Sequence, residues 1–441
     1  MIDANPSTPA LASGVPRAPL TVRDTGLAPT VLIDLVAKAM FYRVRQTPGE
    51  LGELLHLTRF VIEEVLAAMR EEGQVEVAGP ASALEYYFAL TTRGRALAED
   101  AFGRGRYVGP APVAFNDYLA TQAQQSVRLL HPTATQIRQQ LAPLVLRSRI
   151  VDAIGAAVVS TGTVLLYGPS GNGKSTIAAA IRGMLPGAVA IPYAIDVSGQ
   201  TIKFFDGRVH EPLHRGSNTA EPVSDESVRA MDGRYALCRR PLVVLSSELK
   251  LADLELAFSE ADATYIAPPQ MLANGGVLVV DDLGRQLVRP EELLNRWIGP
   301  IGTGWDHLVL RTGETLEVPF DSLLVFATNL DPHDLGDEAF ERRIRHKALI
   351  SSPTRDEFLE ILRREAVVQR IEFVEEVAAE FVDAFYEDDS YLGEGRAPRG
   401  SHPGDILRNL MDFARFEGRP PEMTLERLHE AAEAFFVLDP T

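Results

Sequence analysis

The sequence predicts an α/β protein: a parallel-sheet core, a helical domain after it and a small α+β domain before it. Three observations predict this fold. A glycine-rich loop joins an apolar strand to an alanine-rich helix over residues 164–181, and a second apolar strand, residues 277–282, ends in two aspartates. Four amphipathic helical stretches lie between residue 353 and the end of the chain. Short continuous apolar runs are typical of strands buried on both faces of a parallel sheet.

The composition is that of an ordinary soluble globular protein, with 46% apolar and 24% charged residues among 441. The net charge of −18 argues against broad binding to nucleic acids or anionic membranes, although it leaves room for a local basic patch. No apolar run approaches the ~20 residues that span a bilayer, and residues 1–20 lack the features of a signal peptide. We therefore expect a cytoplasmic protein. Cys238 is the only cysteine; we expect it to be buried, with a reactive thiol as the alternative.

The chain is predicted to divide into five parts. Residues 1–27 are a disordered tail rich in Pro, Ala and Ser, and residues 28–105 form a compact domain. Residues 106–130 begin as a Pro/Gly linker. Residues 131–352 form the core that contains the glycine-rich loop, and residues 353–441 form a helical lid.

Residues 28–105 read as three helices, a hairpin of two strands and a terminal helix. The second helix opens with a capping box, in which Thr47 is the N-cap, Pro48 the first helical residue and Glu50 the residue that reaches back. This order of elements resembles a winged helix. The third helix would then be the recognition helix, which inserts into the major groove of DNA in DNA-binding members.

The charges of this domain argue against that use. The third helix starts with Thr58 and Arg59, but Glu63 and Glu64 follow and would face phosphate poorly. Residues 28–106 hold eleven acidic and nine basic residues. Docking or assembly with protein is therefore the favoured role, and DNA binding is the alternative.

The stretch "GPSGNGKS" matches the complete phosphate-loop pattern, in the strand–loop–helix context that the pattern requires. Its glycines let backbone N–H groups wrap phosphates, and the following helix directs its N-terminal dipole at them. We expect Lys174 to contact the β- and γ-phosphates and Ser175 to bind Mg²⁺. The predicted nucleotide-binding residues are Gly168, Pro169, Ser170, Gly171, Asn172, Gly173, Lys174, Ser175 and Thr176.

Two further strand ends carry polar residues suited to nucleotide hydrolysis. Asp281, at the end of "GGVLVVDD", is expected to hold Mg²⁺, mostly through water. Asp282 would orient or deprotonate the attacking water, with a structural acid that caps the next turn as the alternative. Asn329 ends the strand "SLLVFATN" and could orient the same water.

Together these motifs resemble the AAA+ ATPases, over about 310 residues from 131 onward. The resemblance implies ATP and Mg²⁺ as ligands, a Walker A loop, a Walker B strand and a sensor-1 residue at Asn329. It also implies an arginine finger that reaches the nucleotide of a neighbouring subunit. Arg343 matches that position best and Arg342 second; a surface ion-pairing arginine is the alternative. "DHLVLRTGETLEVPFD" reads as a β-hairpin just before sensor 1, which resembles the branch that contains MoxR-type ATPases.

The sequence departs from this family in two places. Walker B usually ends in Asp-Glu, and Asp282 is one methylene shorter than the usual glutamate. The expected sensor-2 arginine falls at Gly404, and the sequence does not decide between Arg399 and Arg408 as its replacement.

Two other features match known functional patterns, a zinc site and a pore-loop aromatic, but we favour a structural interpretation for both. "HEPLH", from His210 to His214, matches a zinc-protease pattern, but Pro212 opposes the required helix, so we expect a surface loop. Tyr265 could grip a threaded chain in a pore, but a packed aromatic is the favoured reading.

These features predict an oligomeric ATPase, a ring or spiral with a hexamer as one candidate size. Its ATP binding and hydrolysis would drive remodelling or assembly of a protein substrate or adaptor. The alternative is a DNA-associated regulator, and a small-molecule or protein kinase is disfavoured by the arginine segment and the helical lid. Because the core is expected to be self-contained, deletion of residues 1–105 should leave ATP binding intact.

Overall fold

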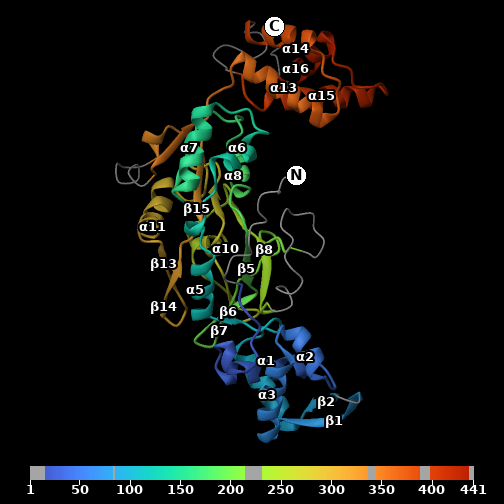
Figure 1. Ribbon diagram of the computed structural model, residues 1–441, viewed down its shortest axis with the longest axis vertical. Coiled ribbons are helices and arrows are strands. Elements are labelled where there is room, and N and C mark those ends of the chain that lie inside the picture. The colour runs from blue at the N-terminus through green and yellow to red at the C-terminus, as the bar shows by residue number, and fades with distance from the viewer. Residues whose placement is uncertain (1–14, 83–84, 214–230, 336–343, 388–397, 437–441) are drawn as a thin grey trace, which may run out of the picture. The chain divides into compact units, whose positions relative to one another are not determined.

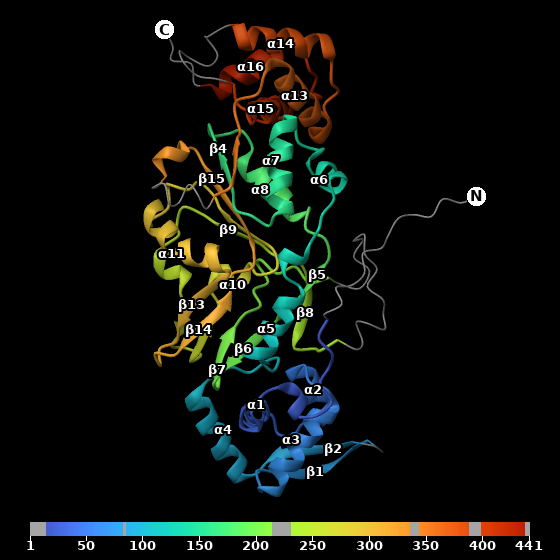
Figure 2. The same ribbon diagram turned by 60° about the vertical axis from the view of Figure 1, so that its left-hand side comes forward.

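The computed structural model describes residues 15–82, 85–213, 231–335, 344–387 and 398–436. The chain divides into two compact units; Figure 1 and Figure 2 show its elements in two views. Unit 1 comprises Met1–Pro132, Leu185–Val279 and Gln286–Leu324, and unit 2 comprises Thr133–Met184, Val280–Arg285 and Val325–Thr441. The predicted core is thus divided between the units, and the five-part division of the chain stays a prediction.

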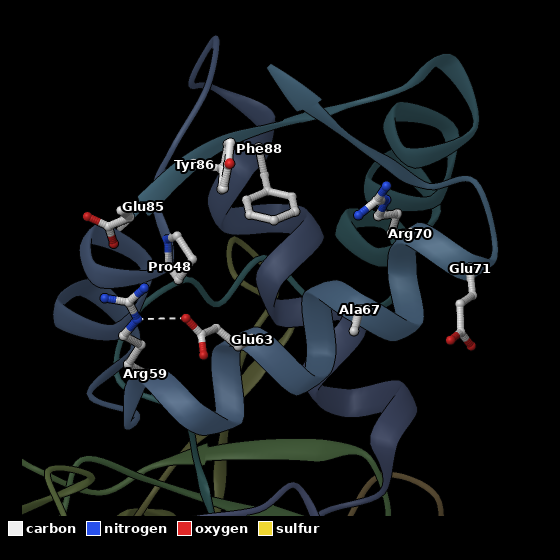
Figure 3. Close-up of a pocket in the computed structure, with 9 residues that line it drawn as sticks. All are labelled: Pro48, Arg59, Glu63, Ala67, Arg70, Glu71, Glu85, Tyr86 and Phe88. Carbon is white, nitrogen blue, oxygen red and sulfur yellow. Dashed lines mark hydrogen bonds and ion pairs between the residues drawn. The ribbon is translucent and has the colours of Figure 1, made fainter. Parts of the chain in front are cut away.

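Unit 1 begins with the elements expected between residues 28 and 105, in the expected order. They are α1 (Pro29–Phe41), α2 (Pro48–Leu55), α3 (Arg59–Glu71), β1 (Val75–Ser82), β2 (Glu85–Leu90) and α4 (Thr92–Arg104). The capping box of α2 is present, because Thr47 and Glu50 each accept a hydrogen bond from the other's backbone N–H. Strands β1 and β2 pair antiparallel, and α3 and β2 border a groove lined by Ala67 and Phe88 (Figure 3).

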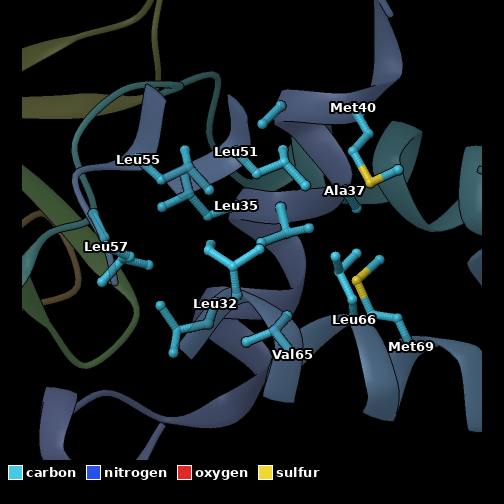
Figure 4. Close-up of a cluster of buried hydrophobic side chains, with 14 of the residues drawn as sticks. Leu32, Leu35, Ala37, Met40, Leu51, Leu55, Leu57, Val65, Leu66 and Met69 are labelled. Atoms are coloured by element: carbon cyan, nitrogen blue, oxygen red, sulfur yellow. The ribbon is translucent and has the colours of Figure 1, made fainter. Parts of the chain in front are cut away.

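The three helices bury one continuous apolar core. Leu32, Leu51 and Leu55 are fully buried, and Leu66 and Met69 of α3 pack in the same cluster (Figure 4). Helix α3 is amphipathic, because its buried residues Val61, Ile62, Val65, Leu66 and Met69 recur at helical spacing. Its other face, which carries the charged residues, is exposed.

The segment 106–130, expected to begin as a Pro/Gly linker, has no helix or strand over residues 106–112 and is folded from residue 113 onward. It contains the short strand β3 (Val113–Ala114) and helix α5 (Phe115–Gln124). Tyr118 is buried, and the side chain of Gln122 donates to Oδ2 of Asp321 at 2.8 Å. The Pro/Gly composition of this segment indicates irregular backbone. The segment is nevertheless packed and hydrogen-bonded to residues far away in the sequence.

Unit 1 also contains a mixed sheet of five strands in the order β10-β11-β7-β6-β3. Its other strands are β6 (Ala194–Val197), β7 (Gln200–Lys203), β10 (Ala257–Ser259) and β11 (Thr264–Ile266). The predicted hairpin with a Ser-Gly turn is confirmed, since β6 and β7 pair antiparallel around Ser198 and Gly199, both at positive φ. A separate antiparallel pair joins β5 (Ala188–Pro192) to β8 (Tyr235–Arg239).

The second five-stranded sheet has the order β16-β4-β15-β12-β9. Its strands are β4 (Val164–Tyr167), β9 (Leu242–Leu245), β12 (Val277–Val280), β15 (Leu323–Thr328) and β16 (His346–Leu349). Strands β15 and β16 both pair with β4 in parallel, and every residue of β12 and β15 is buried. The predicted α/β fold with a parallel-sheet core is therefore confirmed.

The hairpin expected before β15 is also present. Strands β13 (Trp305–Val309) and β14 (Thr315–Pro319) pair antiparallel after helix α11 (Pro290–Thr303). Among the described residues, no helix combines the length and the apolar composition needed to cross a membrane.

Unit 2 ends in four helices, as expected for residues after 353. They are α13 (Arg355–Gln369), α14 (Glu375–Glu387), α15 (His402–Phe416) and α16 (Leu425–Phe435). Their apolar faces share one core that includes Phe358, Phe381, Leu407 and Leu428. The same unit contains α6 (Ala134–Leu141), α7 (Ser148–Val159), which packs against β16, and α8 (Lys174–Arg182).

Candidate nucleotide-binding site

The loop between β4 and α8 has a backbone that only glycine adopts without strain at three positions. Gly168, Gly171 and Gly173 have φ of 125°, 82° and 82°. A Cβ at Gly168 would also lie 2.6 Å from the backbone oxygen of Ile350. Helix α8 begins at Lys174 directly after the loop, so its unpaired N–H groups and its dipole face the region that the loop encloses.

Lys174 is held in place within this loop. Its side chain is nearly buried, and Nζ donates to the backbone oxygens of Gly168 and Pro169, both at 2.9 Å, and to Oδ1 of Asn329 at 2.7 Å. Burial lowers the pKa of Lys174, and the nearby charges of Asp282 and Asp281 oppose that shift. The structure thus brings the loop lysine, the two aspartates and Asn329 together at one end of the parallel strands.

Asn329 links the lysine to the aspartates. Its Nδ2 donates to Oδ1 of Asp282 at 3.3 Å, while its Oδ1 accepts from Lys174. The amide orientation follows from these partners, because only an oxygen can accept from the ammonium. Lys174, Asn329 and Asp282 therefore form a continuous hydrogen-bonded chain.

The backbone at Asp282 is unusual, because its φ is 51°. Aspartate and asparagine enter this left-handed region more readily than most other residues with a side chain. The turn is secured on both sides: the N–H of Asp282 donates to Oδ1 of Asp281 at 3.1 Å, and the N–H of Leu283 donates to the backbone oxygen of Ala327 at 2.8 Å. Thr328 Oγ1 donates to the backbone oxygen of Leu283 at 2.7 Å. The loop after β12 is thus fixed to the end of β15.

A cavity of ≈ 290 Å³ lies beside the loop. Gly171, Asn172 and Thr176 form one wall, and α13 and the start of α15 form another. The lid meets the loop directly, because the N–H of Gly400 donates to Oδ1 of Asn172 at 2.9 Å and the N–H of Ser401 donates to the oxygen of Gly171 at 2.8 Å.

The two arginines considered for the sensor-2 role both lie near the loop. Arg408 lines the cavity and is ion-paired with Asp405. The side chain of Arg399 packs beside Gly171, where an added Cβ would be 3.1 Å from Arg399 Cδ. Gly404 lines the same cavity, and a Cβ there would lie 3.3 Å from Glu365 Oε2.

Sequence reasoning missed some lining residues of the cavity. Arg364 and Glu365 of α13 and residues 143–146 all border it. Arg364 Nη1 donates to the backbone oxygen of Ala142 at 2.7 Å, so α13 is attached to the segment before α7. Two adjacent charged residues on an amphipathic helix are common, so the local sequence gives no sign that Arg364 and Glu365 line a cavity.

The remaining predicted site residues are placed as follows. Ser175 and Thr176 are exposed in the first turn of α8, and Asp281 is half-buried at the end of β12. Arg342 and Arg343 lie outside the described residues.

The zinc reading of His210 is not supported, and the surface-loop expectation is wrong for this residue. His210 is fully buried; its Nδ1 accepts from the N–H of Asp206 at 3.0 Å, and its Nε2 lies 3.0 Å from the oxygen of Leu272. Both ring nitrogens are thus engaged by backbone, and burial lowers the pKa of the ring. His214 lies outside the described residues. Among the residues that the structure describes, no group of three or more His, Cys, Asp or Glu side chains could hold a metal ion.

Tyr265 and Cys238 are packed core residues. Tyr265 is almost fully buried, and its hydroxyl accepts from the N–H of Arg311 at 2.9 Å, which agrees with a packed aromatic and not with a pore residue. Cys238 is fully buried, and burial raises the pKa of its thiol to about 12. The thiol is therefore protonated and unreactive at neutral pH.

Comparison with known proteins gives three results. The model of the domain of unknown function DUF8689 matches residues 354–434, which contain α13 to α16. A search of curated proteins gives no match. Several solved structures are distantly similar.

One of them is the Holliday junction branch migration motor RuvB of Thermotoga maritima, at 14% identity and a TM-score of 0.35, covering 76% of this chain and 73% of that one. NtrX from Brucella abortus in complex with ATP has 14% identity and a TM-score of 0.38, covering 78% and 67%. The FIGL-1 AAA domain in complex with ADP has 16% identity and a TM-score of 0.32, covering 69% and 81%. At such identities and TM-scores the likeness transfers no residue role to this chain.

Proposed function

We propose that this chain is an ATPase of the AAA+ type that works as an oligomer and couples ATP binding and hydrolysis to remodelling or assembly of a protein partner. One observation carries the proposal: the hydrogen-bonded chain from Lys174 through Asn329 to Asp282, located at a phosphate loop. A charged donor for phosphate, a polar residue and a carboxylate base are thereby held within one network.

The residues present fit a nucleoside triphosphate with Mg²⁺. The left-handed glycines give the loop the shape of an anion cradle, and α8 begins where its free N–H groups face the enclosed region. Lys174 would bind the β- and γ-phosphates, while Ser175 and Asp281 would hold the metal, directly or through water. When bound, Mg²⁺ neutralises charge on the phosphates during transfer.

Asp282 and Asn329 would act on the attacking water. The carboxylate of Asp282 accepts a proton or orients the water, and the amide of Asn329 holds that carboxylate in place. The side chain of aspartate is shorter than the glutamate usual in the resembling family. We therefore infer that the left-handed backbone at Asp282 helps to orient this shorter carboxylate toward the attacking water.

The lid would bring positive charge to the nucleotide. Arg408 lines the cavity one helical turn after Gly404 and is the better candidate than Arg399 for the sensor-2 role. Its ion pair with Asp405 would be exchanged for a contact with phosphate when nucleotide is bound. Substitution of Arg408 by alanine tests this role. The same substitution of Arg415, an exposed arginine on the same helix, is the matched control.

The oligomeric part of the proposal rests on Arg343, with Arg342 as second candidate, acting on the nucleotide of a neighbouring subunit. It is tested by measuring phosphate release per protomer and the molecular mass by analytical ultracentrifugation over the same range of protein concentration. We expect the rate per protomer to rise as larger species form, because each site would be completed by its neighbour. Full-rate hydrolysis by a species that stays monomeric would contradict the oligomeric mechanism.

A further inference from the structure

The groove between α3 and the β1–β2 hairpin is an exposed surface that the ATPase site does not use. We call it the α3–wing groove; its volume is ≈ 560 Å³ and its lining includes Glu63, Ala67, Glu71, Glu85, Tyr86 and Phe88 (Figure 3). Tyr86 is 57% exposed although it is large and aromatic. Aromatic side chains of this kind are enriched where proteins dock, because they bury much area at a small entropic cost.

The groove combines an aromatic wall with an acidic rim. Tyr86 and Phe88 lie next to each other on β2; across the groove, Glu63 and Arg70 of α3 lie on the side of the hairpin, and Glu71 lies at the end of α3 and points away from the two rings (Figure 3). The lining holds three glutamates, Glu63, Glu71 and Glu85, and two arginines, Arg59 and Arg70, a net charge of −1. The whole stretch from Arg59 to Leu90 has a net charge of −4. One of the two arginines is already paired, since Arg59 Nε lies 2.6 Å from Glu63 Oε1.

This charge opposes DNA as the occupant. A protein that binds DNA neutralises phosphates with lysine and arginine, whereas this surface has more carboxylates than guanidinium groups, and Arg59 is paired with Glu63. The start of α3, which reads bases in helix-turn-helix proteins, is also occupied by the chain itself. Thr58 Oγ1 donates to the oxygen of Pro19 at 2.6 Å, and the N–H of Val22 donates to Glu64 Oε2 at 2.8 Å.

Residues 232–234 make hydrogen bonds to the chain within and on either side of the domain that bears the groove. Arg234 and Asp232 form a buried ion pair at 2.8 Å. The same guanidinium donates to the oxygens of Thr25, at 2.9 Å, and Pro112, at 3.3 Å. In addition, His56 Nδ1 lies 2.7 Å from the oxygen of Gly233.

We propose that the α3–wing groove binds a cationic segment of the protein partner, with an apolar side chain against Tyr86 and Phe88 and lysine or arginine side chains at Glu71 and Glu85. This inference rests on the proposed function, because it names the chemistry of the partner that the ATPase would act on. The opposite charges would set which segments bind and how fast they associate.

The test uses the full-length protein as bait for a phage-displayed library of random twelve-residue peptides. We expect the enriched peptides to be rich in lysine and arginine and to contain an aromatic or large aliphatic residue. Fluorescence anisotropy then measures the affinity of the best synthetic peptide for the wild type, Tyr86→Ala, Glu71→Lys and Glu99→Lys. The last is the control, because Glu99 is an exposed acid of α4 outside the groove.

We expect Tyr86→Ala and Glu71→Lys each to weaken binding about tenfold or more, and Glu99→Lys to leave it unchanged. Glu71 is exposed on the last turn of α3, so Glu71→Lys tests the groove even if Tyr86→Ala alters folding. Enrichment of acidic or uncharged peptides, no enrichment, or binding that both groove variants leave intact would overturn the proposal. Tight binding of a fluorescent random-sequence DNA duplex that is lost in Arg59→Ala or Arg70→Ala would assign the groove to DNA instead.

Phosphate release is measured for the same variants in the absence of peptide. None of them touches the nucleotide site, so unchanged rates are expected. A wild type without ATPase activity would reject the proposed function, whereas the peptide result alone decides on the groove.

Discussion

The ammonium of Lys174 donates a hydrogen bond of 2.7 Å to Oδ1 of Asn329, a residue 155 positions further along the chain. The same side chain also contacts Asp282, because Nδ2 of Asn329 donates a hydrogen bond to Oδ1 of Asp282. A single amide therefore connects Lys174, which we propose binds phosphate, to Asp282, which we propose acts as the base. The chemistry we propose depends on this arrangement.

Asn329→Ala removes both hydrogen bonds without adding charge. We expect ATP to bind with nearly the wild-type affinity, because Lys174 keeps the loop oxygens as partners, while turnover falls about 10²-fold. Phosphate release and ATP titration by calorimetry measure the two quantities. Asn295→Ala, at an exposed asparagine of α11, is the control. Turnover at the wild-type rate in Asn329→Ala would show that the amide is not needed.

Asp282 allows charge and backbone to be tested separately. Asp282→Asn keeps a residue that tolerates φ near 51°, so the protein should melt as the wild type does, bind ATP and lose about 10²-fold or more in turnover. Asp282→Ala should lose turnover equally and also destabilise the fold by ~1 kcal/mol, because alanine enters the left-handed region less readily. Melting curves and phosphate release test both. If Asp282→Asn hydrolyses ATP normally, Asp282 is a structural acid.

His402 makes the lid sensitive to acid. Its Nδ1 accepts from the N–H of Arg399 at 3.2 Å, and it packs edge-on against the rings of Phe435 and Phe436. Burial, aided by the positive charge of Arg399 and opposed by Asp405, lowers its pKa to about 4. The unfolded chain therefore takes up a proton at higher pH than the folded lid does.

The neutral ring of His402 contributes fully to the free energy of unfolding above about pH 6.5. This contribution is lost as the pH falls toward about 4, by up to ~3 kcal/mol in total. We expect His402→Asn to reduce the drop in melting temperature between about pH 7.5 and about pH 5. His131→Asn, at an exposed histidine, should keep the wild-type drop. Equal drops in wild type and His402→Asn would contradict the assignment.

Arg343 is predicted to act between subunits, so its test is a mixing experiment. Arg343→Ala should bind ATP and hydrolyse it poorly, and Lys174→Ala should not bind it. Mixed oligomers of the two should regain part of the activity, because some junctions join an intact loop to an intact arginine; well-placed fingers raise rates by ~10³–10⁵. Arg415→Ala is the control for a surface arginine. Full wild-type hydrolysis by Arg343→Ala alone would reject Arg343 and leave Arg342 as the candidate.

The parts of the site that local sequence determines could be predicted. The glycine loop, the apolar strands β4, β12 and β15, and the polar residues at their ends follow from short-range patterns and from the shared carboxyl edge of parallel strands. The lid helices follow from their periodicity, and a capping box at Thr354 marks the start of the first.

Other features depend on partners far away in the chain and could not be predicted. Nothing near Tyr118 shows that Asn274 will donate to its hydroxyl at 3.0 Å, so residues 106–130 read as a linker. His210 is buried because Asp206 and Leu272 provide its backbone partners. The buried guanidinium of Arg234 donates to the backbone oxygens of Thr25 and Pro112, which flank residues 28–105, and no local sequence pattern predicts these contacts.

Binding of ATP to wild type and Lys174→Ala, measured by isothermal titration calorimetry with Mg²⁺ present, tests the central claim most directly. We predict one saturable site per wild-type protomer and a loss of affinity of about 100-fold or more in Lys174→Ala, because a charged hydrogen-bond donor to phosphate is removed. Lys250→Ala, at an exposed lysine, should bind as the wild type does. Unchanged affinity in Lys174→Ala, or no binding by the wild type, would contradict a nucleotide site at this loop.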